Sequence, residues 1–309
     1  MTEYGLLWEC STMRASEEFP NGFPTLWGTF RKKLDLTPMS FGHALDHDPP
    51  FNPFEDIPGR RSVWNDVLGS YSRCQLSFPD KDKLVAISGL AKRLGKPENY
   101  LAGLWADDLP SQLLWRHFVV GDGKIPTASS HYRAPSWSWA AYDGLVGYIP
   151  RRVLEESLID IIDANTIPVM KTDPFGQIQG GRICVRCQLA QIVFHDPGSS
   201  VMPSVQISSD TKPFEDSTVL YLLPVMPDSS SSAIDGLVLK PTSNARGQFI
   251  RCGWYSEDDT EPEDMQQMDL SMKQEIAEGF RTLLEKEAYQ EYLGVDPSTK
   301  FHRYQITIV

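Results

Sequence analysis

The sequence predicts an α+β fold, in which a helical N-terminal part packs on an antiparallel β-rich sheet or barrel and a long helix lies near the C-terminus. Residues 62–118 carry apolar side chains at helical spacing, whereas from residue 132 the apolar residues alternate or run over strand lengths. Because helices and strands are grouped rather than alternating one by one, an antiparallel sheet is favoured over a doubly wound parallel one. We expect a mainly helical part over 1–131 and a β-rich part over 132–309, together forming one compact unit.

Four N-terminal segments have the helical repeat. "TLWGTFRKKL" predicts a short helix over 25–34, and "SVWNDVLGSYSRC" predicts one over 62–74 with Ser62 as its N-cap. "DKDKLVAISGLAKRLG" predicts a helix over 80–95 that ends at Gly95, and "DLPSQLLWRHF" predicts a shorter one over 108–118.

The β-rich part contains strand-like runs bounded by turn residues. Strands are expected within 136–142, 158–163, 181–194, 217–225, 234–241, 248–255 and 301–309. "DLSMKQEIAEGFRTLLEKEAYQEYL" predicts one long helix over 269–293, since Ile276, Phe280 and Leu283 share a face.

The composition of the chain makes some classes of binding partner less favourable than others. The formal net charge of −12 disfavours nucleic acid and anionic membranes, because their phosphates repel an acidic surface. No apolar run approaches the roughly 20 residues of a membrane span, and the N-terminus has no signal-peptide pattern. Five scattered cysteines indicate reduced thiols, so we expect a cytoplasmic protein.

Familiar catalytic and cofactor motifs are missing from the sequence. It has no glycine-rich nucleotide loop and no GxSxG nucleophile elbow, so we expect no cofactor. "CVRC" at 184–187 falls in an expected strand, where its two thiols would point to opposite faces, and His43 and His47 have no evident third ligand. We therefore predict no metal site.

The stretch "YRAPSWSWAAYDG" at 132–144 is the main site candidate. As a strand it would place Trp137 and Trp139 on one face, either packing a core or lining a pocket. In the pocket interpretation, Arg133, Tyr142 and Asp143 offer polar contacts at the rim.

This stretch resembles the "YRAPSWSWAS-DG" signature that lies downstream of the catalytic module in fungal heterokaryon-incompatibility (HET) proteins. "LLWECSTMRASEEFP", "YSRCQLSFPDKDKLVAISGLAK", "YLAGLWADDLPSQLLW", "DPFGQIQGGRICVRCQL", "GLVLKP" and "YQITIV" resemble other segments of that family in the same order. The resemblance covers nearly the whole chain. The family's N-terminal HET module is similar to TIR-type NAD-cleaving folds and has no counterpart here, so the resemblance implies no NAD site.

The sequence leaves two functions from different classes open. A third possibility is that the chain is a non-functional remnant of a longer gene. The first is a stand-alone, cofactor-independent cyclase of secondary metabolism, for example for an intramolecular [4+2] Diels-Alder reaction, which orients an apolar small-molecule substrate. Arg133 and Tyr142 would then be the catalytic anchors, and Trp137, Trp139, Asp143 and Trp8 would bind substrate. The second is a truncated HET regulatory or interaction module without enzymatic activity, with loops 257–264 and 228–232 as contacts. The sequence does not predict the oligomeric state.

Overall fold

The fold was examined in a computed structural model, which describes residues 7–9, 14–16, 57–74, 76–118, 125–148, 157–194, 205–228, 233–257, 289–295 and 302–309. The chain groups into two compact units, Met1–Ser70 and Tyr71–Val309. The expected division at residue 131 falls inside the second unit, between strands β6 (Thr127–Ala128) and β7 (Tyr142–Asp143), which pair with each other.

The first unit contains a small ladder and a helix. Strands β1 (Leu7–Glu9) and β2 (Arg14–Ser16) are antiparallel, and Trp8 stands opposite Ala15 in their register. Helix α2 (Ile57–Tyr71) begins five residues before the predicted Ser62 cap, with Pro58 in the first turn, where its missing N–H costs nothing. The helix expected over 25–34 lies outside the described residues.

The helical segments of the second unit are shorter than predicted. The helix expected over 80–95 is divided into α3 (Pro79–Asp82) and α4 (Ser88–Leu94), and Gly95 follows the last residue of α4. The sequence predicts an apolar face of Leu84, Ile87, Leu90, Ala91 and Leu94; four of these side chains are buried, and Leu90 is partly exposed. The helix expected over 108–118 was wrong beyond its first turn: α5 is Leu109–Gln112, and Arg116–Phe118 forms strand β5, which pairs with β8 (Leu145–Gly147).

Short elements connect α4 to α5. They are the 3-10 turns η3 (Pro97–Asn99) and η4 (Ala106–Asp108), and the paired strands β3 (Tyr100–Leu101) and β4 (Leu104–Trp105). A further 3-10 turn, η5 (Trp139–Ala141), lies between β6 and β7. Between β3 and β4, Ala102 and Gly103 both have positive φ, which makes the turn tight.

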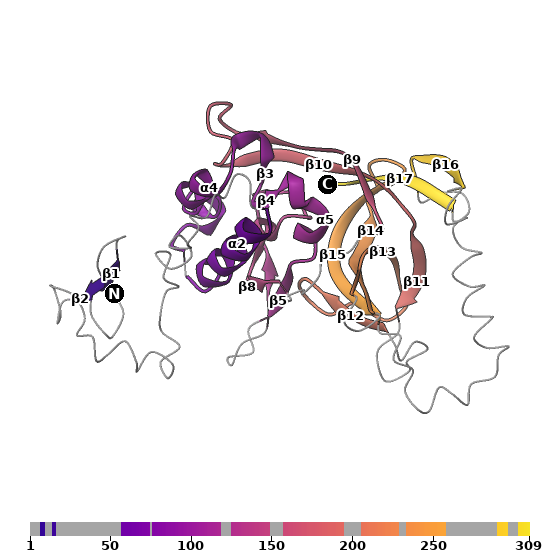
Figure 1. The fold of residues 1–309 in the computed structure, drawn as a ribbon. Helices are drawn as coiled ribbons and strands as arrows, with labels where there is room; N and C mark the ends of the chain where they lie inside the picture. Colours follow the sequence, from indigo (N-terminus) through magenta and orange to yellow (C-terminus); the bar gives the residue numbers. More distant parts are fainter. Residues whose placement is uncertain are drawn as a thin grey trace. The chain divides into compact units, whose positions relative to one another are not determined.

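A nine-stranded sheet dominates the second unit (Figure 1). Its order is β11-β13-β14-β15-β17-β10-β9, while β12 also pairs with β15 and β16 with β17. The strands are β9 (Asp160–Pro168), β10 (Ile178–Cys187), β11 (Ala190–Phe194), β12 (Val205–Ser209), β13 (Thr218–Asp228), β14 (Ala233–Pro241), β15 (Gln248–Glu257), β16 (Glu291–Val295) and β17 (His302–Ile308).

The sheet is almost wholly antiparallel, as predicted. Only β15 and β17 run parallel, over two residue pairs at Gln248 and Phe249. The barrel alternative was wrong, because the order begins at β11 and ends at β9 without closing.

The sheet carries an apolar cluster of Ile192, Leu220, Leu222, Val238 and Tyr255. Helix α5 packs against β13, which brings the helical segments onto the sheet. The sheet therefore supports the segments that carry the candidate site residues.

The long C-terminal helix was predicted over 269–293. Residues 269–288 lie outside the described residues, and Glu291–Val295 form strand β16, antiparallel to β17. The predicted helical end was therefore wrong, because pairing with β17 outweighs the local helical pattern. The terminal strand was confirmed as β17.

Candidate functional site

The stretch 132–144 does not form the expected strand. Residues 136–138 turn, η5 follows at Trp139–Ala141, and only Tyr142–Asp143 belong to a strand. The Ser138 hydroxyl accepts a hydrogen bond from the Ala140 N–H at 3.0 Å and donates one to the Ala102 carbonyl at 2.6 Å. A serine that binds the local backbone in this way favours a turn over a β ladder.

Both candidate indoles lie in filled space. Trp137 and Trp139 have exposed fractions of 0%, so no water-sized sphere reaches either ring from outside or from an internal hollow. The Trp139 indole donates to the Gly103 carbonyl at 2.9 Å, and Gly103 must be glycine because a Cβ would lie 2.6 Å from that same Nε1. Trp115 donates to the Trp137 carbonyl at 2.9 Å. Within the described part of the chain, the two rings therefore pack the core, where the Trp137 Nε1–H has no hydrogen-bond partner.

Arg133 and Asp143 join the two ends of the stretch. The buried Arg133 guanidinium donates to the Ala140 carbonyl and lies 3.1 Å from Asp143 Oδ1. Lys83 Nζ lies 3.0 Å from the same oxygen. Burial lowers the pKa of Lys83, and Asp143 opposes that shift. Two buried cations thus share one carboxylate, whose side chain is 40% exposed.

Tyr142, the second candidate anchor, is also engaged. Its hydroxyl donates to the Arg251 carbonyl at 3.0 Å, and burial raises its pKa well above the ordinary value. Since its single proton is already donated to the backbone, the hydroxyl has none to offer a substrate in this state. Trp8, the last candidate, lies in β1, and only its backbone is described.

The fully buried Arg251 of β15, whose guanidinium makes several hydrogen bonds, was missed by the sequence prediction. Its guanidinium binds both oxygens of Asp210, at 2.8 and 3.1 Å, and donates to the carbonyls of Leu113 and Trp115 at 2.6 and 2.7 Å. It also lies 3.3 Å from the centre of the Trp115 ring. The available signal was an arginine inside the otherwise apolar run "QFIRCGWY".

A second buried ion pair supports the same junction. Arg116 of β5 lies 2.8 Å from Asp235 of β14 and stacks 3.8 Å over the Trp254 ring. Both charged side chains are about 7% exposed. These two ion pairs hold the helical segments on the sheet. None of their four residues lines the hollow beside the β14–β15 turn.

The CxxC stretch lies in β10. Cys184 and Cys187 are buried and unbridged, and burial raises the pKa of both thiols, which disfavours the reactive thiolate. No group of three or more His, Cys, Asp and Glu side chains that suits a metal ion occurs among the described residues. His43 and His47 lie outside them.

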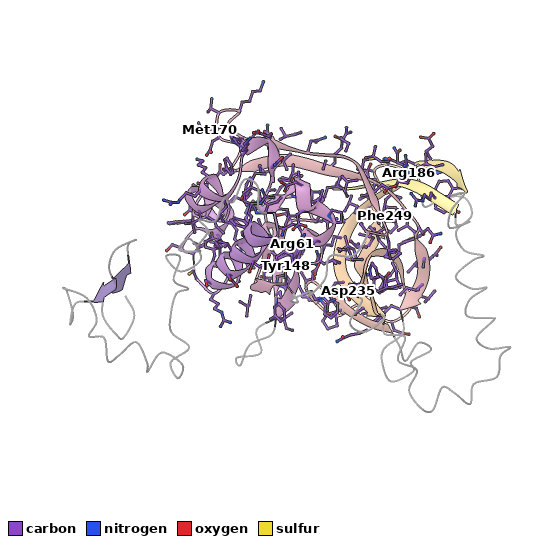
Figure 2. All side chains as sticks on the ribbon, in the orientation of Figure 1. Arg61, Tyr148, Met170, Arg186, Asp235 and Phe249 are labelled. Carbon is purple, nitrogen blue, oxygen red and sulfur yellow. The ribbon has the colours of Figure 1, made fainter. Side chains whose placement is uncertain are left out.

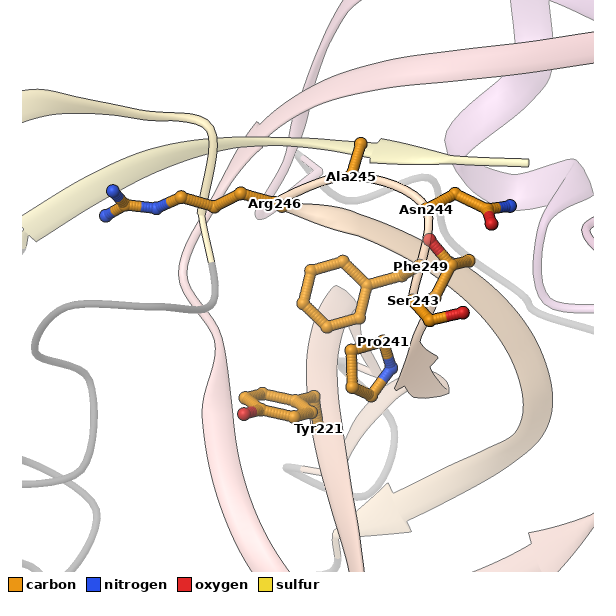
Figure 3. A pocket seen from close by; sticks show the side chains of 9 residues that line it. Tyr221, Pro241, Ser243, Asn244, Ala245, Arg246 and Phe249 are labelled. Carbon is orange, nitrogen blue, oxygen red and sulfur yellow. The ribbon is translucent and has the colours of Figure 1, made fainter.

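A hollow of about 410 Å³ opens beside the turn between β14 and β15 (Figure 3). Tyr221, Pro241 and Phe249 form its apolar side, and turn residues 242–247 form its rim. The rings of Tyr221 and Phe249 meet edge to face with their centres 5.2 Å apart. None of the predicted site residues lines it.

Strand β9 forms one end of the sheet. It pairs with β10 on one side, and no strand in the described part of the chain pairs with its other side. Thirteen large apolar side chains are exposed in that part, and five of them fall within residues 158–170: Leu158, Ile162, Ile167, Val169 and Met170. Figure 2 shows Met170 projecting from the outer end of the β9–β10 hairpin. Two of the five, Ile162 and Ile167, lie in β9 itself, and the other three lie just before or just after it.

Comparisons with known proteins give no match: no protein-family model, curated protein or solved structure is similar to this chain. The HET resemblance thus stays a prediction. Among the described helices, none is both long enough and apolar enough to cross a membrane.

Proposed function

We propose that this chain is an interaction module, which binds an extended segment of a partner protein by adding it as a strand beside β9. The observation that carries the proposal is the exposed edge of β9 with its concentration of exposed apolar side chains. An open edge offers backbone N–H and C=O groups in a row, and strand addition uses those groups for affinity.

The usable length of the edge follows from its register. The pairing of β9 with β10 is regular from Asp163 to Ile167 and is interrupted by irregularities on either side. Pro168, at the end of the strand, has no N–H to donate. The proposed docking edge is therefore residues 163–167, extended by the exposed side chains of Val169 and Met170.

The net charge of the chain indicates the partner's chemistry. The edge itself sets no charge preference, because Asp160 and Asp163 already pair with arginines of β10 and β17. The whole chain has a net charge of −12, so two copies repel each other while a cationic segment is attracted. We therefore expect a partner strand in which Lys or Arg alternates with apolar residues.

The cyclase hypothesis remains a proposal without a site among its predicted residues. A pericyclic catalyst needs a hollow that folds the substrate, whereas Trp137 and Trp139 are fully buried and the Tyr142 proton is donated to the backbone. The interaction function is supported by a surface feature, and we place it first for that reason.

The test uses blocked octapeptides and the full chain. A peptide of alternating Lys and Val should bind saturably in a fluorescence polarisation assay, and its Glu and Val counterpart should bind about tenfold more weakly, since cross-strand charge pairs contribute up to about 1 kcal/mol each. Methylating alternate backbone nitrogens of the Lys peptide should abolish binding, because the ladder bonds are lost.

A pair of matched variants locates the binding. Ile167→Lys should weaken the Lys peptide by placing a like charge on the edge, whereas Val85→Lys, at a similarly exposed position outside the sheet, should not. Equal affinity for the Lys and Glu peptides, or binding that tolerates methylation, contradicts the proposal. A dimer of the chain that Ile167→Lys dissociates also contradicts it, since the partner would then be a second copy.

A further inference from the structure

Ile167 of β9 lies against a glycine of the neighbouring strand. In the register it stands opposite Gly180 of β10, and a Cβ built on Gly180 would lie 3.1 Å from Ile167 Cδ1 but 3.7 Å from Ile167 Cβ. The outer carbon of the isoleucine is thus nearer to that point than its own Cβ is, so the side chain leans over β10. Its other side, above the open edge of β9, is left uncovered, and its exposed fraction is 52%.

Two successive glycines of β10 show which face of the sheet Ile167 occupies. A Cβ on Gly181 would lie 2.7 Å from Pro135 Cγ and 3.2 Å from the buried Trp137 ring, so this position faces the core. Because successive residues of a strand point to opposite faces, Gly180 and its partner Ile167 belong to the outer face.

Val169 extends this apolar surface toward the turn of the β9–β10 hairpin. It stands two residues beyond Ile167, and its exposed fraction is 51%. The Val169 N–H donates to the Gln177 carbonyl at 2.8 Å, so the pairing of the two strands continues past Pro168. Ile167 and Val169, with the bare Gly180 beside them, form what we call the ledge.

The end of the hairpin that carries the ledge is anchored to the helical segments. The buried Phe175 ring packs on the Tyr100 ring, with the ring centres 4.7 Å apart. The Gln177 side chain donates to the Lys81 carbonyl at 3.0 Å. A surface that is held in this way loses little entropy when a partner binds.

We infer that the partner strand carries an aromatic residue at the position facing Ile167, whose ring packs on the ledge. This inference rests on the proposed function, since it specifies one side chain of the segment that binds beside β9. Neighbouring strands lie about 4.8 Å apart, and a planar ring reaches the leaning isoleucine across that spacing more fully than a valine does. Aromatic and β-branched residues are also favourable cross-strand partners.

The test compares two blocked octapeptides by fluorescence polarisation with the full chain. The parent alternates Lys and Val, and the second has phenylalanine in place of one central valine. The phenylalanine peptide should bind about threefold more tightly than the parent, within the range of aromatic cross-strand pairs. In Gly180→Val the new side chain displaces Ile167 toward the open edge, so this ratio should fall to about one while the parent still binds. Gln206→Val, an exposed position in β12, is the control and should keep the ratio.

A second pair of variants leaves the glycine in place. Val169→Ser should lower the ratio of the two affinities, whereas Val193→Ser, at a similarly exposed valine of β11, should not. Equal affinity of the wild-type chain for the two peptides overturns the inference and leaves the proposed function standing. A ratio unchanged in both Val169→Ser and a folded Gly180→Val also overturns the inference alone. Failure of both peptides to bind the wild-type chain overturns the inference together with the proposed function.

Discussion

Replacing Asp210 by Asn removes one charge from the buried junction of Arg251 and the helical segments. The two side chains are 1% and 0% exposed, and the carboxylate accepts two of the guanidinium's hydrogen bonds. Arg251 keeps its bonds to the Leu113 and Trp115 carbonyls but loses its counter-ion. An uncompensated buried charge typically costs about 3–5 kcal/mol, so we expect the free energy of unfolding to fall by that amount.

Asp163→Asn is the matched control. It makes the same chemical change in the ion pair of Asp163 with Arg182, in which the Arg182 side chain is 60% exposed and that of Asp163 is 47% exposed. The free energy of unfolding should fall by at most about 1 kcal/mol. Both variants are measured by equilibrium urea unfolding, followed by tryptophan fluorescence and circular dichroism. If Asp210→Asn lowers the free energy of unfolding no more than Asp163→Asn does, at an unchanged m value, then the Asp210–Arg251 pair does not hold the helical segments on the sheet.

Three further predictions concern the same core. Trp139→Ala should lower the free energy of unfolding by about 3–5 kcal/mol, because the ring is fully buried and its N–H serves Gly103; a loss below about 1 kcal/mol in urea unfolding would mean that the ring sits in loose space. Gly103→Ala should also destabilise markedly, since its φ is +95° and the Cβ would overlap the Trp139 indole; a melting temperature equal to that of wild type would contradict this geometry. Burial lowers the pKa of His117 to about 4 from an ordinary 6.5. Because the unfolded chain therefore binds the proton more readily than the folded one, the free energy of unfolding should be greatest above pH 6.5. It should fall by up to about 3 kcal/mol as the pH drops toward 4. His117→Gln should flatten that slope in urea titrations across this range, and an unchanged slope would assign the acid sensitivity to other groups.

The strands of the sheet were predictable because local patterns specify them. The apolar runs at 217–225, 234–241 and 248–255 became β13, β14 and β15, and the last residues became β17. The order of the strands was not predictable, because pairings such as β15 with β17 join distant segments. The position of β9 at an edge, on which the proposed function depends, follows only from that order.

The candidate site shows where local reasoning fails. Alternating Ser and Trp residues at 136–139 suggested a strand with one apolar face, but Trp137 and Trp139 are both buried by partners far away in the sequence, including Gly103 and Trp115. Arg133, Tyr142 and Asp143 were predicted as polar contacts at the rim of a pocket, whereas here they bind the protein's own backbone and charges. The arginine in "QFIRCGWY" was a local signal of a buried charge, but its partner Asp210 lies 41 residues away and could not be inferred from the local pattern.

Hydrogen–deuterium exchange with the alternating Lys and Val peptide tests the proposed function most directly. Adding the peptide should slow the exchange of backbone amides in β9, chiefly over residues 163–167, and leave those of β11 at the opposite end of the sheet unchanged. Unchanged exchange in β9 at saturating peptide, or equal protection of β11, would contradict strand addition at this edge.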